Sequence, residues 1–426
     1  MRTILHADLN SCYASVECAV NPALRDVPLA VGGNKELRHG IILAKNELAK
    51  KAGVQTGEAI WQAQKKCPHL VIVEPHYALY KQYCERAREI YLQYTDCVES
   101  FGPDECWLDV TGSLHLFGSG EKIAHEIRNR IREELQVTVS VGVSWNKTFA
   151  KFGSDYKKPD AVTVITPENY RHIVWPCPTG DLLFVGRATQ QRLRNRGIFT
   201  VGDIVESGLE TMQSTLGKNG ETLYMAAAGM DFSPVKRYYE ADPVKSVGNS
   251  ATPARDLKNE ADARLLLYIL SDSVARRLRV YGLSCTGVQL YLRDTQLNTL
   301  ERQLQFAKTV STAYEICNAG LLLLRRHWDF VLPLRSIGIR AIGLQTAQPG
   351  IQTCLFAEER RLQNKEILEC TADRIRERFG QGSIFRAVLL GDRALSRSAL
   401  PSEAPTAFAA AMHREQKLQF LTGEGR

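Results

Sequence analysis

The chain has 426 residues, more than one hydrophobic core usually serves, so we expect it to fold as several domains. Hydrophobic residues make up 44% of the sequence and charged residues 24%, which excludes a fibrous or wholly disordered protein. Lys and Arg number 54 against 47 Asp and Glu, and the net charge of +7 suits a polyanionic partner without requiring one.

Membrane insertion and secretion are not expected. No run approaches the roughly 18 uninterrupted apolar residues of a membrane span. The first residues include Arg2, His6 and Asp8, where a signal peptide would be apolar. The 11 cysteines form no C-x-x-C pair, so reduced thiols are expected rather than a disulfide framework or a zinc ribbon. The sequence therefore predicts a cytoplasmic protein without a membrane partner.

The predicted elements begin with a short strand over residues 2–7, which runs directly into Asp8, and a helix can start over residues 11–17. Apolar residues at helical spacing predict two longer helices over residues 79–94 and 123–135. Three further apolar segments predict strands: residues 97–101, 106–111 and 137–143. The order strand, helix, strand, strand, helix, strand is the split β-α-β arrangement of a ferredoxin-like α+β domain.

The rest of the chain indicates further domains. About 60 residues separate the first strand from the first long helix, too many for a simple connection, so they are interpreted as an inserted subdomain. Residues 176–237 are predicted to be helical, and residues 246–343 alternate strand-like and helical stretches. Residues 401–426 lack periodicity and are expected to form a mobile tail.

The strongest local feature is a pair of adjacent carboxylates, Asp104 and Glu105, at the junction of two predicted strands. Neighbouring residues of a regular strand point to opposite faces, so only a turn lets this pair converge, and Gly102-Pro103 supplies one. In a split β-α-β sheet the middle strands lie beside the first strand. We therefore expect Asp8 to meet Asp104 and Glu105 in one small volume.

Three carboxylates this close repel one another unless a cation neutralises them. With no His or Cys expected nearby, hard oxygen ligands favour Mg²⁺, or Mn²⁺ as a substitute, over zinc. Two such ions about 3.5–4 Å apart can activate a 3′-hydroxyl and stabilise a departing pyrophosphate. Each motif taken singly also fits a simpler reading, with Asp104 and Glu105 as turn residues and Asp8 as an acid at a helix N-terminus.

A resemblance decides between these readings, because three motifs occur in order along the chain. They are DLNSCYASVE at residues 8–17, Asp104-Glu105 with LDVT at 108–111, and GVSWNKTFAK at 142–151 followed by SDYKKP at 154–159. From residue 1 to about residue 390 the chain resembles the Y family of translesion DNA polymerases. The resemblance implies a multi-domain α+β fold: a right-hand polymerase with a ferredoxin-like palm, small fingers, a helical thumb with a helix-hairpin-helix, and an α/β little finger.

The resemblance also implies where the domains begin and end. The expected domains are palm 1–10 and 78–165, fingers 11–77, thumb 166–238, linker 239–245, little finger 246–347, C-terminal extension 348–400 and tail 401–426.

In the family, the counterparts of Asp8, Asp104 and Glu105 are the catalytic metal ligands, and the counterpart of Leu9 lends a backbone carbonyl. Tyr13 matches the steric gate, whose ring would collide with a ribose 2′-hydroxyl. Lys158 is expected against the incoming triphosphate, and the free amides after Leu9 suit phosphate oxygens. A core tyrosine and a solvated lysine remain the alternatives for these two residues. The expected nucleotide-binding residues are Asn10, Ser11, Cys12, Tyr13, Lys50 and Lys158.

The sequence departs from the family pattern at three places. Asn10 stands where Asp is common, and Gly102-Pro103 replaces a Ser-Ile pair before the carboxylates. Residues 44–50 replace a motif that usually offers Tyr and Arg to the triphosphate: Lys50 keeps a positive charge, whereas Glu47 does not keep the Tyr. These departures put nucleotide affinity in question and leave the three metal ligands intact.

Several segments resemble DNA-binding elements of the family. Residues 183–203 resemble a helix-hairpin-helix that presents backbone amides near Gly186 to a DNA phosphate, although a plain helix-turn-helix packing unit is equally possible. Residues 241–350 carry 14 basic against 9 acidic residues. Arg335 and Arg340 lie in a strand-like stretch that could follow a phosphate backbone, with a solvated sheet face as the alternative.

The resemblance finally implies partners and a reaction. Gln352, Leu355 and Phe356 resemble a peptide that binds the sliding clamp (DNA polymerase III beta subunit), and residues 416–420 are a weaker candidate. The expected enzyme is a monomer that adds deoxynucleoside triphosphates to primer-template DNA in translesion synthesis and DNA repair. A catalytically impaired homologue serving as a DNA-binding or scaffolding subunit is the first alternative. A cyclase or nuclease on a similar palm is the second.

Overall fold

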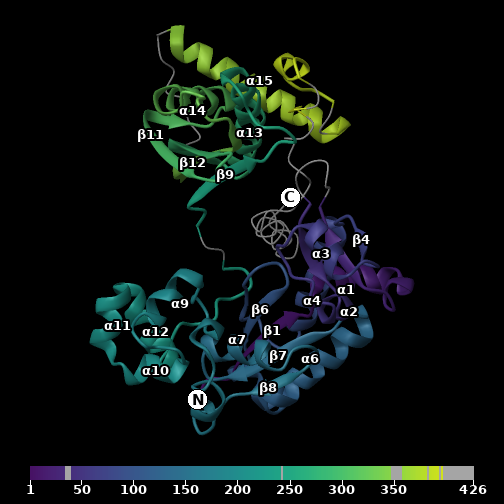
Figure 1. The fold of residues 1–426 in the computed structure, drawn as a ribbon. Helices are drawn as coiled ribbons and strands as arrows, with labels where there is room; N and C mark the ends of the chain where they lie inside the picture. Colours follow the sequence, from purple (N-terminus) through teal and green to yellow (C-terminus); the bar gives the residue numbers. More distant parts are fainter. Residues whose placement is uncertain (34–39, 241–242, 347–356, 381–382, 393–394, 397–426) are drawn as a thin grey trace. The chain divides into compact units, whose positions relative to one another are not determined.

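The computed structural model describes residues 1–33, 40–240, 243–346, 357–380, 383–392 and 395–396, with side chains in its last long helix described from residue 364 onward. The chain forms two compact units (Figure 1). The first comprises Met1–Gly33 and Ile41–Ala241, and the second contains Asp242–Glu403. Within the described residues, no helix is long and apolar enough to cross a membrane.

A five-stranded sheet forms the centre of the first unit, in the order β5-β6-β1-β7-β8. β8 pairs in parallel with β7, and the other neighbours are antiparallel. The expected split β-α-β order is therefore confirmed, although the first strand starts two residues later than expected and ends at Leu9 rather than before Asp8. The strands are β1 Ile4–Leu9, β5 Val98–Ser100, β6 Glu105–Asp109, β7 Val139–Ser144 and β8 Val162–Val164.

Helices cover both faces of this sheet. Helices α4 (Tyr77–Tyr91) and α6 (Gly120–Leu135) share one core with Leu5, Ala7 and Leu9 of β1. Helix α7 (Lys147–Tyr156) lies on the other face, where its Ala150 packs with Ile4 and Trp107. Because side chains alternate along a strand, His6 and Asp8 share the α7 face with Ile4.

Two smaller groups of elements complete the first unit. Helix α1 (Cys12–Val20) follows β1 directly and leads to a three-stranded sheet in the order β3-β2-β4. A helical segment follows β8, and Gly217, with φ of +64°, turns the chain between its last two helices. These elements are β2 Leu29–Gly32, β3 Ile42–Lys45, α2 Glu47–Lys51, α3 Ile60–Lys66, β4 Val71–Val73, α5 Leu114–Phe117, α8 Tyr170–Ile173, α9 Arg187–Arg194, α10 Val201–Glu206, α11 Leu209–Leu216 and α12 Lys218–Ala227.

The second unit is a four-stranded antiparallel sheet, in the order β11-β10-β12-β9, with helices packed on one face. Leu266 of α13, Ile316 of α14 and Ile339 of β12 belong to its single buried core. The elements are β9 Ser246–Ala251, α13 Glu260–Val280, β10 Leu283–Asp294, β11 Thr299–Val310, α14 Ala313–His327, β12 Leu334–Thr346 and α15 Ala357–Phe379.

Ion pairs join the C-terminal helix α15 to α13. Arg279 of α13 lies 2.5 Å from Glu369 and 2.6 Å from Asp373 of α15. Asp272 of α13 pairs with Arg376 and, beyond the helix, with Arg386. These groups are largely buried, so α15 is part of the folded second unit.

Candidate active site

The register between β1 and β6 brings two of the three predicted carboxylates together. Asp8 lies directly opposite Glu105, and His6 lies opposite Trp107. Directly opposed residues of an antiparallel pair project from the same face of the sheet. Asp8 and Glu105 therefore meet on the face that α7 covers.

The third carboxylate, Asp104, precedes the first residue of β6. Its backbone carbonyl accepts a hydrogen bond from the Leu9 amide at 3.3 Å, so it lies at the end of β1. Burial, together with the charges of Asp8 and Glu105, raises the pKa of Asp104 to about 6. The Asp104 carboxyl is thus close enough to feel the charges of the other two, but the side-chain groups whose ligand atoms lie within 4.8 Å of one another are His6, Asp8 and Glu105. A divalent cation would relieve the repulsion among the carboxylates.

All three carboxylates line one cavity of about 460 Å³. The start of α1 and the end of β3 also line this cavity. Of the predicted residues, Asp8, Leu9, Ser11, Cys12, Tyr13, Asp104, Glu105 and Lys158 line it, together with Leu43, Ala44, Lys45, Thr56, Pro103, Lys151 and Asp155.

Two lysines place positive charge among the carboxylates. The Lys158 ammonium lies 2.7 Å from Asp8 and 2.7 Å from Asp155. Lys151, which the sequence analysis did not single out, lies 2.9 Å from Asp8 and 2.8 Å from Glu105. One feature of the sequence could have predicted Lys151: it lies four residues before Asp155, which puts both side chains on one face of α7.

A histidine also lies beside the carboxylates, so the expectation that none is near them was wrong. His6 is fully buried, with Nε2 at 3.3 Å from Glu105 and Nδ1 at 2.9 Å from the Ser154 hydroxyl. Burial lowers the pKa of His6. Burial also opposes ionisation of Glu105, but hydrogen bonds with His6 and Lys151 outweigh it and lower the pKa of Glu105 to about 2. The sequence does contain a sign of His6: it lies two residues before Asp8 in the same strand, and this spacing places both side chains on one face of the sheet.

Tyr13 lines the cavity and is held by two other aromatic rings. It stacks on Tyr80 with the ring centroids 4.3 Å apart and the planes 16° from parallel. Tyr77 meets Tyr13 edge-on at 6.1 Å. The Tyr80 hydroxyl donates a hydrogen bond to buried Glu17. Burial raises the pKa of Tyr13 to about 12, so the phenol is neutral at physiological pH.

Two predicted nucleotide-binding residues do not line the cavity. Asn10 is buried, where its amide group donates to Ser140 at 2.9 Å and accepts from the Asp160 amide at 2.8 Å. Lys50 is exposed on α2 and lies 3.4 Å from Glu47. Lys45, at the end of β3, lines the cavity in place of Lys50.

The predicted DNA-binding residues lie elsewhere. Gly186 is an exposed residue that immediately precedes α9, as its N-cap. Arg340 is exposed on β12, and Arg335 is half-buried where β12 has one extra residue opposite Arg293 and Asp294 of β10. The predicted clamp-binding residues Gln352, Leu355 and Phe356 lie outside the described residues, as does the alternative at 416–420.

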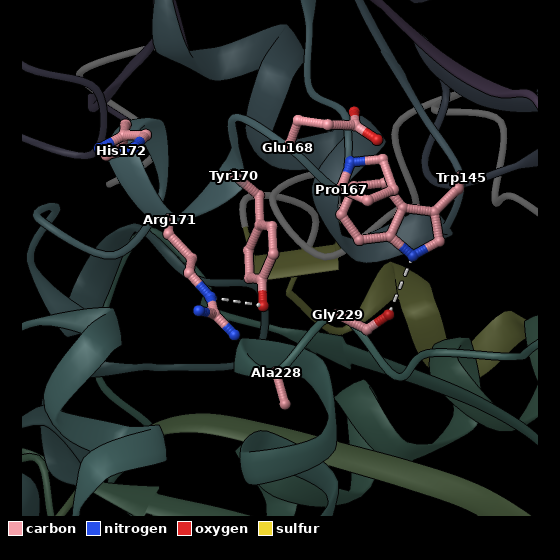
Figure 2. A pocket seen from close by; sticks show the side chains of 8 residues that line it. All are labelled: Trp145, Pro167, Glu168, Tyr170, Arg171, His172, Ala228 and Gly229. Carbon is pink, nitrogen blue, oxygen red and sulfur yellow. Dashed lines mark hydrogen bonds between the residues drawn. The ribbon is translucent and has the colours of Figure 1, made fainter.

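A second cavity of the first unit, about 770 Å³, contains none of the predicted residues. Figure 2 shows its wall, where the Trp145 indole donates to the Gly229 carbonyl at 3.1 Å. The Arg171 guanidinium donates to the Tyr170 hydroxyl at 3.3 Å. This cavity holds no group of carboxylates, since Glu168 is its single acidic residue.

Comparisons with known proteins match most of the chain. Residues 7–155 match the impB/mucB/samB family, residues 244–354 match the C-terminal domain of that family, and residues 180–231 match a thumb domain described for DNA polymerase-iota. DNA polymerase IV of Acetivibrio thermocellus is 49% identical over 396 residues, which cover 93% of this chain and 99% of the relative. DNA polymerase IV of Pelotomaculum thermopropionicum is 35% identical over 91% of this chain and 95% of the relative.

Among solved structures, a Y-family DNA polymerase chimera aligns with a TM-score of 0.70 at 23% identity, covering 80% of this chain and 98% of the chimera. That likeness confirms the predicted multi-domain α+β polymerase fold. The family matches and the identity to the relatives over nearly the whole chain establish kinship. The chain therefore belongs to the impB/mucB/samB family and is a Y-family DNA-directed DNA polymerase that resembles DNA polymerase IV.

Proposed function

We propose that the chain adds deoxynucleotides to a primer 3′ end in low-fidelity translesion synthesis, using two Mg²⁺ ions held by Asp8, Asp104 and Glu105. The observation that carries this proposal is the meeting of the three carboxylates in one cavity with Tyr13 and Lys158. Leu9 lines the same cavity, and its backbone carbonyl would complete the ligand set. When bound, the ions would activate the primer hydroxyl and stabilise charge on the leaving pyrophosphate.

The side chains of the cavity then have separate tasks. Lys158 and Lys151 supply positive charge to the triphosphate oxygens, since their ammonium groups lie within 3 Å of the carboxylates. The amides at the start of α1 face the same cavity through Ser11 and Cys12 and suit a phosphate. Tyr13, fixed by its stack on Tyr80, excludes a 2′-hydroxyl from the sugar position. Mn²⁺ would substitute for Mg²⁺ at oxygen ligands.

The expected domains follow from this assignment. The sheet that carries the carboxylates is the palm, residues 11–77 the fingers, 166–238 the thumb and 246–347 the little finger. Primer-template DNA is the substrate, with Gly186, Arg335 and Arg340 against its backbone, and the protein works as a cytoplasmic monomer. Exposed Arg340 and the exposed N-terminus of α9 support these backbone contacts.

Primer extension by the purified chain tests the proposal. Wild-type protein with Mg²⁺ should extend a primer, whereas Asp8→Asn, Asp104→Asn and Glu105→Gln should each lose about 10³-fold or more in rate. DNA binding by the same variants is the control and should persist. Intact primer-template binding without incorporation by the wild type would instead indicate a DNA-binding or scaffolding subunit.

A sliding clamp is the proposed protein partner, through Gln352, Leu355 and Phe356. Leu355→Ala combined with Phe356→Ala should weaken recovery of the chain on immobilised clamp while leaving primer extension without clamp unchanged. If deleting residues 416–420 weakens recovery and the double substitution does not, the clamp-binding peptide lies in the tail.

A further inference from the structure

We propose that Arg88 is a positioning residue, which holds the turn that carries Asp104 and Glu105 in the geometry needed for metal binding. The proposal rests on the two-metal function above and assigns the task to a side chain that lies outside the cavity. Arg88 is on α4, behind the sheet face that carries Asp8 and Glu105.

Arg88 lies against the residues immediately before and after the two carboxylates. Its side chain is buried, and Nη2 donates a hydrogen bond to the Pro103 carbonyl at 2.5 Å. The Cys106 thiol also lies close enough to its guanidinium to raise the pKa of Arg88. Pro103 immediately precedes Asp104, and Cys106 immediately follows Glu105. One cation is therefore bonded to the residue before the catalytic pair and lies near the residue after it.

One hairpin bond closes the turn, from the Phe101 amide to the Glu105 carbonyl at 2.9 Å, but the residues between these two need further support. Glu105 is positioned by its pairing with Asp8, but Asp104 lies before the start of β6. Gly102 has φ of +89°, a conformation that glycine adopts without strain and that the turn requires. The backbone bond from the Leu9 amide to the Asp104 carbonyl fixes one side of this turn, and Arg88 fixes the other.

The surroundings of Arg88 indicate that its buried charge has a role in addition to the packing of its side chain. Among the described residues, no carboxylate lies within ion-pair distance of its guanidinium, and its Nε has no hydrogen-bond partner. Burial by itself lowers the pKa of Arg88, but the thiols of Cys106 and Cys84 outweigh burial and raise it, so the side chain is charged. Burying an arginine without a carboxylate partner is costly. The neighbouring anionic site and the turn are the groups that this charge can serve.

Substitution of Arg88 separates positioning from simple core packing. Arg88→Met keeps most of the side-chain length but removes the charge and the hydrogen bond to Pro103. We expect kcat for correct nucleotide to fall about 10- to 100-fold, the size of effect that a misplacement of about 1 Å produces. KM for the nucleotide and affinity for primer-template DNA should stay within about twofold, because Arg88 touches neither. The Mg²⁺ concentration for half-maximal rate should rise.

Two further variants complete the experiment. Arg88→Lys keeps the charge and can reach Pro103 but cannot also reach Cys106, so its kcat should lie between those of wild type and Arg88→Met. Arg86→Met, two residues earlier on the exposed side of α4, is the matched control and should leave every parameter unchanged. Thermal unfolding of each variant reports whether the fold is intact.

The outcomes are distinct. A wild-type kcat in Arg88→Met, or a loss of kcat accompanied by equal losses in nucleotide and DNA binding, would overturn the positioning role. Should Arg88→Met fail to fold, Arg88→Lys decides: unchanged kcat overturns the proposal, and a kcat at least threefold lower at unchanged KM supports it. If Asp104→Asn is as active as wild type, the two-metal function itself fails, which a result on Arg88 alone does not imply.

Discussion

The Lys158 ammonium lies 2.7 Å from Oδ2 of Asp8, although the two residues are 150 positions apart in the chain. The contact is possible because Asp8 projects from the sheet face that α7 covers, and Lys158 follows the end of that helix. A lysine within reach of a metal ligand is also within reach of the phosphates that such a metal would bind. This relationship makes the role of Lys158 testable.

Lys158→Met should raise KM for deoxynucleoside triphosphates about 10- to 100-fold, because a charge-assisted hydrogen bond contributes about 1.5–3 kcal/mol. Steady-state primer extension over a range of nucleotide concentrations measures the effect. Lys157→Met is the control, since Lys157 is exposed and outside the cavity and should leave KM unchanged. Equal KM values for the two variants would contradict the assignment of Lys158.

Asp104 predicts a pH dependence of metal binding. Its pKa of about 6 exceeds the ordinary value of 3.8, so the folded protein without metal binds this proton more tightly than the unfolded chain does. The resulting stabilisation is present below about pH 4 and is lost as the pH rises through about 6. Because metal binding requires the ionised carboxylate, Mg²⁺ affinity should fall about tenfold per pH unit below pH 6.

Thermal unfolding with and without Mg²⁺ at pH 5 and pH 8 checks this dependence. The Mg²⁺-induced rise in Tm should be larger at pH 8. In Asp104→Asn the difference between the two pH values should shrink, because the group that titrates is gone. An equal rise at both pH values in the wild type would show that Asp104 is already ionised at pH 5.

The aromatic stack predicts sugar selectivity. Tyr13→Ala should admit ribonucleotides by removing the ring that meets the 2′-hydroxyl. Tyr80→Leu should also raise the ratio of ribonucleotide to deoxynucleotide incorporation, to a smaller extent, because Tyr80 holds the Tyr13 ring at 4.3 Å. Tyr80→Phe keeps the stack and loses only the bond to Glu17, so its ratio should stay near wild type. Unchanged sugar selection in Tyr13→Ala would remove the gate assignment.

The parts of the site that the sequence predicted are those set by short-range pattern and sheet topology. Asp8, Asp104 and Glu105 could be placed together because strand order and a Gly-Pro turn determine their meeting. His6 was missed although its position two residues before Asp8 places both side chains on one face of β1. Lys151 was missed because its contacts with Asp8 and Glu105 depend on how α7 packs on the sheet. The same applies to Arg88 on α4.

The residues assigned to the fingers show a second limit of prediction from the sequence. The sequence has several lysines between residues 44 and 51, and Lys50 was chosen because it keeps a positive charge in the segment that replaces the family motif. The structure ends β3 at Lys45 and then begins α2, whose exposed face carries Lys50 away from the cavity. A shift of a few residues at a strand-helix boundary thus decides which cation reaches the site, and such boundaries are poorly determined by propensity.

The ion pairs of α15 predict how strongly the C-terminal helix supports the second unit. Arg279→Met would remove the cation that Glu369 and Asp373 share and leave Glu369 beside Arg386 at 3.2 Å and Asp373 beside Arg376 at 3.4 Å. Breaking a buried pair costs up to about 3–5 kcal/mol, and the remaining cations reduce this loss, so urea unfolding of the second unit should shift to lower concentration. Arg325→Met breaks the exposed pair with Glu260 and should shift the unfolding much less. Similar losses for both variants would mean that the α15 contacts contribute no more than a surface pair.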